Sequence, residues 1–336
     1  MKLHFRHLAT ALGVVLASAC LGLLALPSTG AQRAADYRPP AFQPRFDART
    51  SPKVVIDGGH REMHTMEGGY APLATLLRAD GLRVRALTDA PVSRTALEGI
   101  DVLVVSNARP PGEAEDALAS DAQAFADAEV DALDAWVSQG GSLLLVADHY
   151  PFGLHVRSLS ARFGVRMDGG YVADVEHANI ASGDDGQILF QRATGGLGEH
   201  WITGPLSTVQ SFTGQALHPD SGTCLLRLGA KAERFKAVAT RRGDDVEVRM
   251  EPGGSAGGWC QAVAGAHGRG RVVVLGEAAM ITAQVDRQDQ PFGMQLSGDD
   301  NELFALQVVR WLAHGDTPGA GNTSGDGHRN RRMDNE

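Results

Sequence analysis

Histidine and carboxylate side chains follow directly on short apolar runs at several points along this chain. The clearest case is residues 54–65 (VVIDGGHREMHT), where an apolar run ends at Asp57 and two glycines lead to His60 and His64. Imidazole and carboxylate groups are the side chains that enzymes most often use to transfer protons or to bind divalent metal ions. The polar residues that follow the end of an apolar run in this way are Asp57, His60, His64, Asn107, Asp148, His149 and Glu277.

The apolar runs themselves predict the strands of a parallel sheet. They are short, rich in Val, Leu and Ile, and bounded by glycine or polar residues, which is typical of strands buried on both faces. The runs are residues 53–57, 101–106, 142–147 and 271–275, and a further strand is expected at 83–87. Helical patterns at 70–81 and from residue 127 alternate with them, which predicts an α/β fold with a doubly wound, mainly parallel sheet. Since the carboxyl ends of parallel strands meet at one edge, we expect the polar residues that follow them to line one cleft.

A metal site is the first chemistry that these residues suggest. Two histidines with carboxylates are standard ligands for zinc or a related divalent ion, and a bound ion would activate water for hydrolysis. The spacing of His60 and His64 resembles that of zinc ligands on a helix, although here it lies in a loop that begins with two glycines.

Two further interpretations remain open. One is metal-free acid/base or nucleophilic chemistry, with His149 or His60 as the base and Asp148, Asp57 or Glu277 as the group that orients it. The other is that the cleft catalyses nothing and binds a ligand or a segment of another protein.

Several other functions lack their sequence signals. Neither a serine nucleophile motif (G-x-S-x-G) nor a dinucleotide or phosphate loop follows a predicted strand. Cys224 and Cys260 lie next to no histidine or metal-type cluster, so we expect a disulfide or two buried thiols and not a cysteine nucleophile. The formal net charge of -9, without a basic stretch in the folded part, argues against a nucleic-acid partner.

The N-terminus predicts where the protein works. Lys2 and Arg6 precede an apolar segment at residues 8–26, and small residues follow, which is typical of a secretory signal. We therefore expect a periplasmic or secreted protein that meets the membrane only through this segment. Cys20 could instead be lipidated in a lipoprotein, or the segment could stay uncut as an anchor.

Changes of composition along the chain predict its organisation. Residues 32–52 carry four prolines and no periodicity, whereas between 169 and 265 glycines are frequent and short alternating segments replace helical patterns. The spacing from Asp299 to Glu302 predicts a capping box at the start of the last helix. The predicted regions are a signal peptide (1–31), a linker (32–52), the first part of the α/β domain (53–168), a β-rich insertion (169–265), the last part of the α/β domain (266–315) and a disordered tail (316–336).

Five segments together resemble a family of exported bacterial proteins of unknown function. The segments are 54–65, 68–81 (GGYAPLATLLRADG), 140–153 (GGSLLLVADHYPFG), 268–284 (GRGRVVVLGEAAMITAQ) and 299–312 (DDNELFALQVVRWL). The resemblance covers about residues 53–315. It implies a class I glutamine amidotransferase-like fold, which is the flavodoxin-like variant of the doubly wound sheet.

The resemblance implies no activity. True amidotransferases carry a cysteine at the tight turn after a central strand, with a His and a Glu late in the chain. Here the matching turn carries Asp148 and His149, and the late Glu is Glu277, so glutamine hydrolysis is not implied. Other residues of the family's late motif line the same cleft or pack in the core: Gln284, Gly293, Met294 and Asn301.

The sequence thus predicts an exported protein with an amidotransferase-like fold and a β-rich insertion. Our first interpretation is a hydrolase-like enzyme, and the alternative is a non-catalytic ligand- or protein-binding module of the cell envelope. A divalent metal ion is the only cofactor that the residues suggest, and its identity stays open. The predicted catalytic residues are Asp57, His60, His64, Asp148, His149 and Glu277.

Overall fold

The computed structural model describes residues 32–33, 37–47, 49–88, 91–112, 122–167, 169–178, 187–243, 245–285 and 291–315. The predicted signal peptide and the predicted C-terminal tail lie outside these residues. Among the helices in these ranges, none has the length and apolar character needed to cross a membrane.

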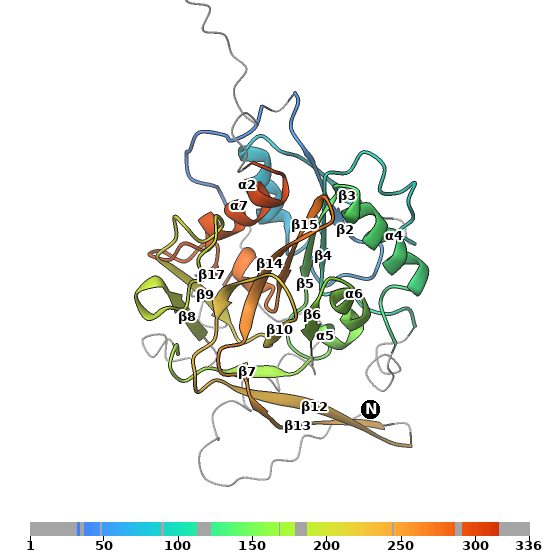
Figure 1. Cartoon of the computed structure of the whole chain (residues 1–336), viewed down its shortest axis with the longest axis vertical. Helices are drawn as coiled ribbons and strands as arrows, with labels where there is room; N and C mark the ends of the chain where they lie inside the picture. The colour runs from blue at the N-terminus through green and yellow to red at the C-terminus, as the bar shows by residue number, and fades with distance from the viewer. Residues whose placement is uncertain are drawn as a thin grey trace, which may run out of the picture.

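A nine-stranded sheet forms the centre of the described structure (Figure 1). Its order is β3-β2-β4-β5-β15-β14-β10-β6, with β11 also paired to β14. The first five strands run parallel, and they are β3 (Arg83–Leu87), β2 (Lys53–Asp57), β4 (Val102–Ser106), β5 (Ser142–Val146) and β15 (Gly270–Leu275). The predicted doubly wound, mainly parallel α/β class is confirmed.

Helices cover both faces of the parallel part (Figure 1). The face that presents Val54 and Ile56 packs against α2 (Ala71–Ala79) and α7 (Asn301–Leu312). The opposite face, which presents Val55, packs against α4 (Asp127–Ser138), and the short helices α5 (Phe152–His155) and α6 (Arg157–Arg162) lie beside α4. Successive residues of a strand point to opposite faces, so strands buried on both sides read as continuous apolar runs.

The β-rich region both extends the central sheet and forms small sheets of its own. The strands β10 (Leu217–Pro219), β11 (Thr223–Arg227) and β14 (Cys260–His267) join the central sheet antiparallel to their neighbours, as does β6 (Val165–Met167). A disulfide between Cys224 and Cys260 links β11 to β14, which decides between the two states that the sequence left open.

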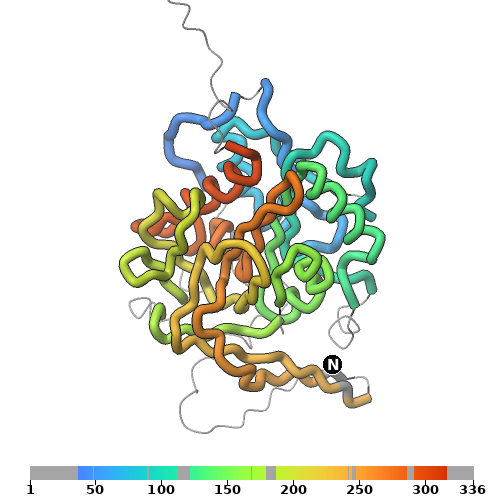
Figure 2. Tube along the Cα trace, in the orientation of Figure 1, coloured from blue at the N-terminus to red at the C-terminus, as the bar shows by residue number. Residues whose placement is uncertain are grey.

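The remaining strands of the β-rich region form two small sheets outside the central sheet. A long hairpin of β12 (Glu233–Arg242) and β13 (Asp245–Ser255) pairs with β7 (Tyr171–Ala173) and projects as an arm in Figure 2. A second pair consists of β8 (Gln187–Gln191) and β9 (Thr208–Phe212), and the 3-10 helix η2 (Arg192–Thr194) follows β8.

The segment predicted as a linker packs against the α/β domain where it is described. Phe46 is buried in the core beside α2 and α7, and the Arg45 guanidinium donates to the Gly315 carbonyl. At its start, β1 (Gln32–Arg33) pairs with β16 (Ala283–Val285), which pairs in turn with β17 (Pro291–Gly293). The 3-10 helix η3 (Ala279–Ile281) precedes β16.

The predicted capping box of the last helix does not form. Helix α7 begins after Asp300, which makes no side-chain cap. Instead, the Asp300 carboxylate accepts hydrogen bonds from the backbone N–H groups of Ser207 (2.6 Å) and Thr208 (3.0 Å). The carboxylate therefore ties the start of β9 to the start of α7, because the unpaired N–H groups of the strand compete for it.

Candidate functional site

The loops after β2 and β4 meet where the chain changes faces of the sheet. The connection from β2 to β3 carries α2 on one face, whereas the connection from β4 to β5 carries α4 on the other. In open α/β sheets, ligands bind at this kind of switch point, beyond the carboxyl ends of the strands.

The two loops are held together by backbone hydrogen bonds. Met63 N–H donates to the Asn107 carbonyl (3.2 Å), and Arg109 N–H donates to the His60 carbonyl (2.9 Å). Arg61 and Asn107 both have left-handed backbone angles, with φ of 57° and 53°. Such conformations are costly for residues other than glycine and concentrate at functional sites, so these loops are built to a specific shape.

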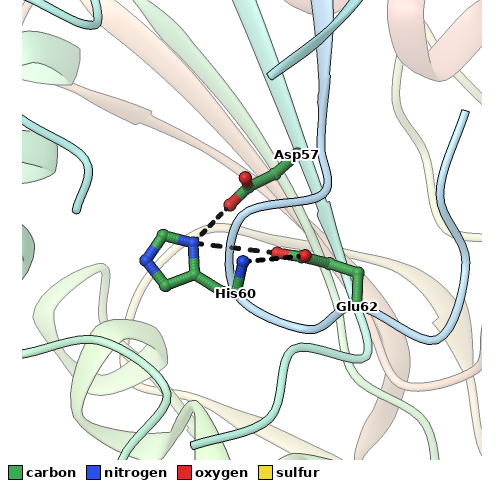
Figure 3. Close-up of side chains that lie close together, drawn as sticks. All are labelled: Asp57, His60 and Glu62. Carbon is green, nitrogen blue, oxygen red and sulfur yellow. Dashed lines mark hydrogen bonds and ion pairs between the residues drawn. The ribbon is translucent and has the colours of Figure 1, made fainter. Parts of the chain in front are cut away.

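Asp57, His60 and Glu62 gather inside the first loop (Figure 3). The Asp57 Oδ2 atom lies 2.7 Å from His60 Nδ1, and the Asp57 Oδ1 atom accepts the Gly59 N–H. Glu62 points back toward His60: its Oε2 atom accepts the backbone N–H of His60 at 2.9 Å, and its Oε1 atom lies 3.8 Å from the ring atom His60 Nδ1. The three side chains are between 0% and 4% exposed, so the group is closed off from bulk water.

Glu129, in the first turn of α4, completes this group from the other side of the ring. Its Oε1 atom lies 3.0 Å from His60 Nε2 and accepts the Val92 N–H, while its Oε2 atom accepts the Ala126 N–H. The ring also stacks on Phe125, with the centroids 4.0 Å apart. Both ring nitrogens of His60 therefore face carboxylates.

The electrostatics of the group follow from three carboxyl groups around one imidazole. Burial lowers the pKa of His60, but the hydrogen bond and charge of Asp57, with smaller effects from Glu129 and Glu62, outweigh it and raise the pKa to about 9. Burial and the nearby negative charge of Asp57 raise the pKa of Glu62 to about 8. Without a cation, these shifts favour the protonated forms of the His60 imidazole and of the Glu62 carboxyl group.

The same three residues could hold a metal ion. Each offers one ligand atom, and the three atoms lie within 4.8 Å of one another. No N–H group of the described residues donates to the buried Glu62 Oε1 atom, an arrangement that costs free energy unless a proton shared with Asp57 or a cation contacts this oxygen. An imidazole with two carboxylates is a ligand set that zinc and related divalent ions accept.

A second group of predicted site residues lies on the opposite face of the sheet. His64 stacks on the buried ring of Tyr70, and the charge of Asp148 acts on His64, on Tyr70 and on Glu277. Burial lowers the pKa of His64 to about 4, so this imidazole is neutral at neutral pH. Burial and the charge of Asp148 raise the pKa of Glu277 well above its ordinary value.

Glu277 and His149 each make local contacts in this second group. The Glu277 carboxylate accepts the N–H groups of Ala279 (2.6 Å) and Met280 (2.8 Å) and so caps η3. The His149 ring stacks on Tyr171, and its Nδ1 atom lies 3.0 Å from the Tyr150 carbonyl oxygen.

The structure therefore divides the predicted cleft in two. His60 stacks on a residue of the core beside α4, whereas His64 stacks on a residue of the core beside α2, so the two histidines do not converge on one ion. Asn107 stands between the groups, because its side-chain oxygen accepts the Asp148 N–H (2.8 Å) while its backbone carbonyl accepts from Met63.

The residues of the late motif serve the packing of the domain. Asn301 donates to the carbonyls of Gln210 and Met280 and joins β9 to η3. Gln284 is 6% exposed and donates to the Thr282 hydroxyl. Met294 is buried in the core, and Gly293 has a positive φ and approaches the Thr282 carbonyl too closely for a Cβ atom.

Glu62 and Glu129 are the members of the buried group that the predicted site lacks. Glu62 lies within the motif at residues 54–65, two residues after His60. This short spacing is the sequence signal that could have added Glu62 to the predicted site. Glu129 is 69 residues from its histidine partner, and a carboxylate in the first turn of a helix ordinarily indicates only a cap.

Comparisons with known proteins support the fold alone. No protein-family model and no curated protein matches the chain. Among solved structures, it is similar to the mmIFT52 N-terminal domain, at 15% identity and a TM-score of 0.53, covering 79% of this chain and 99% of that one.

Weaker likenesses extend to two bacterial proteins. Cytoplasmic protein STM1381 from Salmonella typhimurium LT2 has 15% identity and a TM-score of 0.44, over 77% of this chain and 99% of the other. A putative ThuA-like protein from Parabacteroides merdae has 10% identity and a TM-score of 0.42, over 79% and 91%. Only the likeness with a TM-score above 0.5 bears on the architecture, and function must be argued from the site.

Proposed function

We propose that this chain is a hydrolase-like enzyme that binds a divalent transition-metal ion through Asp57, His60 and Glu62. The observation that carries the proposal is the Glu62 Oε1 atom, which is buried, accepts no hydrogen bond from an N–H group of the described residues and points toward the imidazole and carboxylate beside it (Figure 3). A cation among these atoms would give that oxygen a partner and would offset the repulsion between the carboxylates.

Glu129 strengthens the fit. Histidines that bind metal ions usually donate their other ring N–H to a carboxylate, which fixes the tautomer and the direction of the ring. Glu129 lies 3.0 Å from His60 Nε2, so it would hold the proton there and turn Nδ1 toward Asp57 and Glu62. The mixed nitrogen and oxygen donors favour zinc or manganese over calcium or magnesium, which prefer oxygen alone.

The reaction class follows from the number of ligands. Three protein ligands leave a coordination position open for water, which is the pattern of catalytic and not of structural zinc sites. The ion would lower the pKa of a water molecule and so supply a nucleophile at neutral pH. The location at the switch point of the sheet also supports a ligand site, because that crevice is where α/β proteins bind their substrates.

The metal can be tested directly. Protein purified without chelators is analysed for bound metals, and zinc and manganese binding to the metal-free protein is measured by calorimetry. We expect about one ion per chain, at least a tenfold loss of affinity in Glu62→Gln, and no change in the matched control Glu98→Gln, an exposed carboxylate. A metal-free protein that binds neither ion, or equal binding by both variants, would contradict the proposal.

Catalysis is tested on the same samples. Chromogenic carboxylic and phosphoric esters are offered to the protein with and without the ion, and we expect hydrolysis that Glu62→Gln and chelation both abolish. Asp148→Ala and His149→Ala separate the two groups of residues, since on this proposal both keep most of the activity.

A second candidate function is a non-catalytic binding module in which the ion only stabilises the loop after β2. The burial of Asp57, His60 and Glu62 favours it, because a substrate must reach the ion past side chains that are at most 4% exposed. Under this alternative, metal removal lowers the melting temperature but no ester or phosphoester is hydrolysed.

We also propose that the protein is exported, as its N-terminal segment indicates. The Cys224–Cys260 disulfide supports this, because such bonds persist mainly in oxidising compartments. Fractionation of expressing cells, with N-terminal sequencing of the mature chain, tests it: a periplasmic chain cleaved near residue 31 is expected, and lipid on Cys20 would identify the anchored form. A full-length cytoplasmic chain would refute export.

A further inference from the structure

A second arrangement of charged residues occurs after β7, outside the groups described above. The side chain of Asp174 is fully buried, and its carboxylate accepts the N–H groups of Gly229 (2.7 Å) and Glu176 (3.2 Å). The Asp174 Oδ2 atom lies 2.8 Å from His177 Nδ1. Asp174 therefore fixes the direction of the His177 ring and leaves Nε2 as the ring atom that can meet a ligand.

A cavity of about 330 Å³ opens beside this pair. His177 and Glu176 form one part of its wall, and Thr194, Arg227 and the backbone at Gly229 form others. This volume has room for a small organic molecule.

Two side chains of the cavity wall, Arg227 and His177, carry N–H donors that the described residues do not fully pair. Arg227 is exposed at its edge and makes no ion pair with another described residue, so its guanidinium is available to a ligand. The hydrogen bond to Asp174 raises the pKa of His177, which keeps a proton on Nε2 over a wider pH range. Two N–H donors of positive character thus line one cavity.

Glu176 restricts which anion fits. It contributes to the same wall, and its carboxylate accepts the backbone N–H of Lys231 at 3.0 Å and lies 3.9 Å from the Lys231 ammonium group. The loop can approach this closely only because residue 229 is glycine: a Cβ atom there would lie 2.7 Å from Glu176 Oε2 and 2.8 Å from Asp174 Oδ1. Glu176, whose charge the exposed Lys231 only partly offsets, repels a ligand with two negative charges more strongly than one with a single charge, and a single carboxylate matches the planar fork of an arginine.

We propose that this cavity binds a small monocarboxylate, held by the Arg227 guanidinium and the His177 Nε2–H group. The site does not depend on the metal ion or on the hydrolase-like function proposed above. Its ligand would lie with the carboxylate at the two donors and the remainder of the molecule toward Thr194 and the glycine backbone.

The experiment is a titration of the full chain with sodium butyrate at constant ionic strength, followed by NMR of the histidine rings and arginine Nε–H groups. We expect saturable shifts of His177 and Arg227 signals, at least tenfold weaker binding in Arg227→Gln, and unchanged binding in Arg249→Gln, a control at an exposed arginine of β13. Glu176→Gln should admit inorganic phosphate, which the unsubstituted protein should bind less tightly than butyrate.

Three outcomes would overturn the proposal. The first is a shift that grows linearly with butyrate and never saturates, and the second is equal binding by the Arg227 and Arg249 variants. The third is tighter binding of phosphate than of butyrate by the unsubstituted protein, which would assign the cavity to a different anion. Circular dichroism of each variant verifies that the fold is retained.

Discussion

Replacing Glu129 tests whether the group around His60 is as tightly coupled as its geometry indicates. Glu129→Ala removes the acceptor for three N–H groups at once: His60 Nε2 at 3.0 Å, Val92 at 2.7 Å and Ala126 at 2.9 Å. The residue is 8% exposed, so water does not readily replace the lost partners. We therefore expect Glu129→Ala to lower the free energy of unfolding by more than the removal of an exposed carboxylate does.

The magnitude follows from what the substitution leaves behind. A buried donor without an acceptor costs about 1–3 kcal/mol, which applies to the N–H groups of His60 and Val92. Loss of the bond to Ala126 at the start of α4 costs about 1 kcal/mol more. The expected total is about 3–7 kcal/mol, and Glu129→Gln, whose amide oxygen still accepts one donor, should lose roughly half of that.

Urea denaturation followed by circular dichroism measures both variants. Asp131→Ala is the matched control on the same helix, because this carboxylate is 67% exposed in its ion pair with Arg162 and should cost under about 0.5 kcal/mol. Zinc affinity should fall about 10- to 100-fold in Glu129→Ala, since the imidazole loses the carboxylate that orients it. The reasoning is refuted if Glu129→Ala costs no more than the control.

Three other predictions concern separate parts of the fold. Gly69→Ala would place a Cβ atom 2.1 Å from His64 Nδ1 and should cost about 1–3 kcal/mol; adding His64→Ala should restore most of it in a double-mutant cycle, and an additive result would contradict the clash. Arg310→Ala removes the two-point partner (2.7 and 2.8 Å) of the buried Asp80 and should cost about 3 kcal/mol in urea, with the loss absent if the ion pair is not formed. His177→Gln should reduce stability most between about pH 4 and 6.5 and less as the pH rises further, because the folded pKa of His177 is raised above 6.5 and that of its aspartate partner is lowered below 3.8; a pH-independent difference would count against the pairing.

Residue patterns were sufficient to predict the parallel part of the sheet. Strands buried on both faces need continuous apolar runs, and the predicted strand at 142–147 agrees with β5 to within one residue. The strands that extend this sheet were harder to place. β14 contains alanine and glycine and has no clear alternation, so its sequence does not indicate that it pairs with β15.

The residues of the predicted site lie at the carboxyl edge of the sheet, in two groups and not in one. The position of a residue after a strand places it at the carboxyl edge, yet the face is decided by alternation along the strand. Asp57 lies two residues after Val55, on the face beside α4, whereas Asp148 lies two residues after Val146, on the face beside α2. The alternation of side chains along each strand would therefore have assigned Asp57 and Asp148 to opposite faces. The contact between His60 and Glu129 depends on the packing of α4 and has no local signal in the sequence.

The central claim, that a divalent ion binds among Asp57, His60 and Glu62, is tested most directly by anomalous X-ray diffraction. Crystals of the metal-free protein soaked in zinc should give an anomalous peak at the zinc edge about 2.0–2.2 Å from Asp57 Oδ2, His60 Nδ1 and Glu62 Oε1. The peak should vanish in Glu62→Gln and persist in Glu98→Gln. A zinc-soaked crystal without density at these three atoms, or with the ion bound at other residues only, would contradict the account.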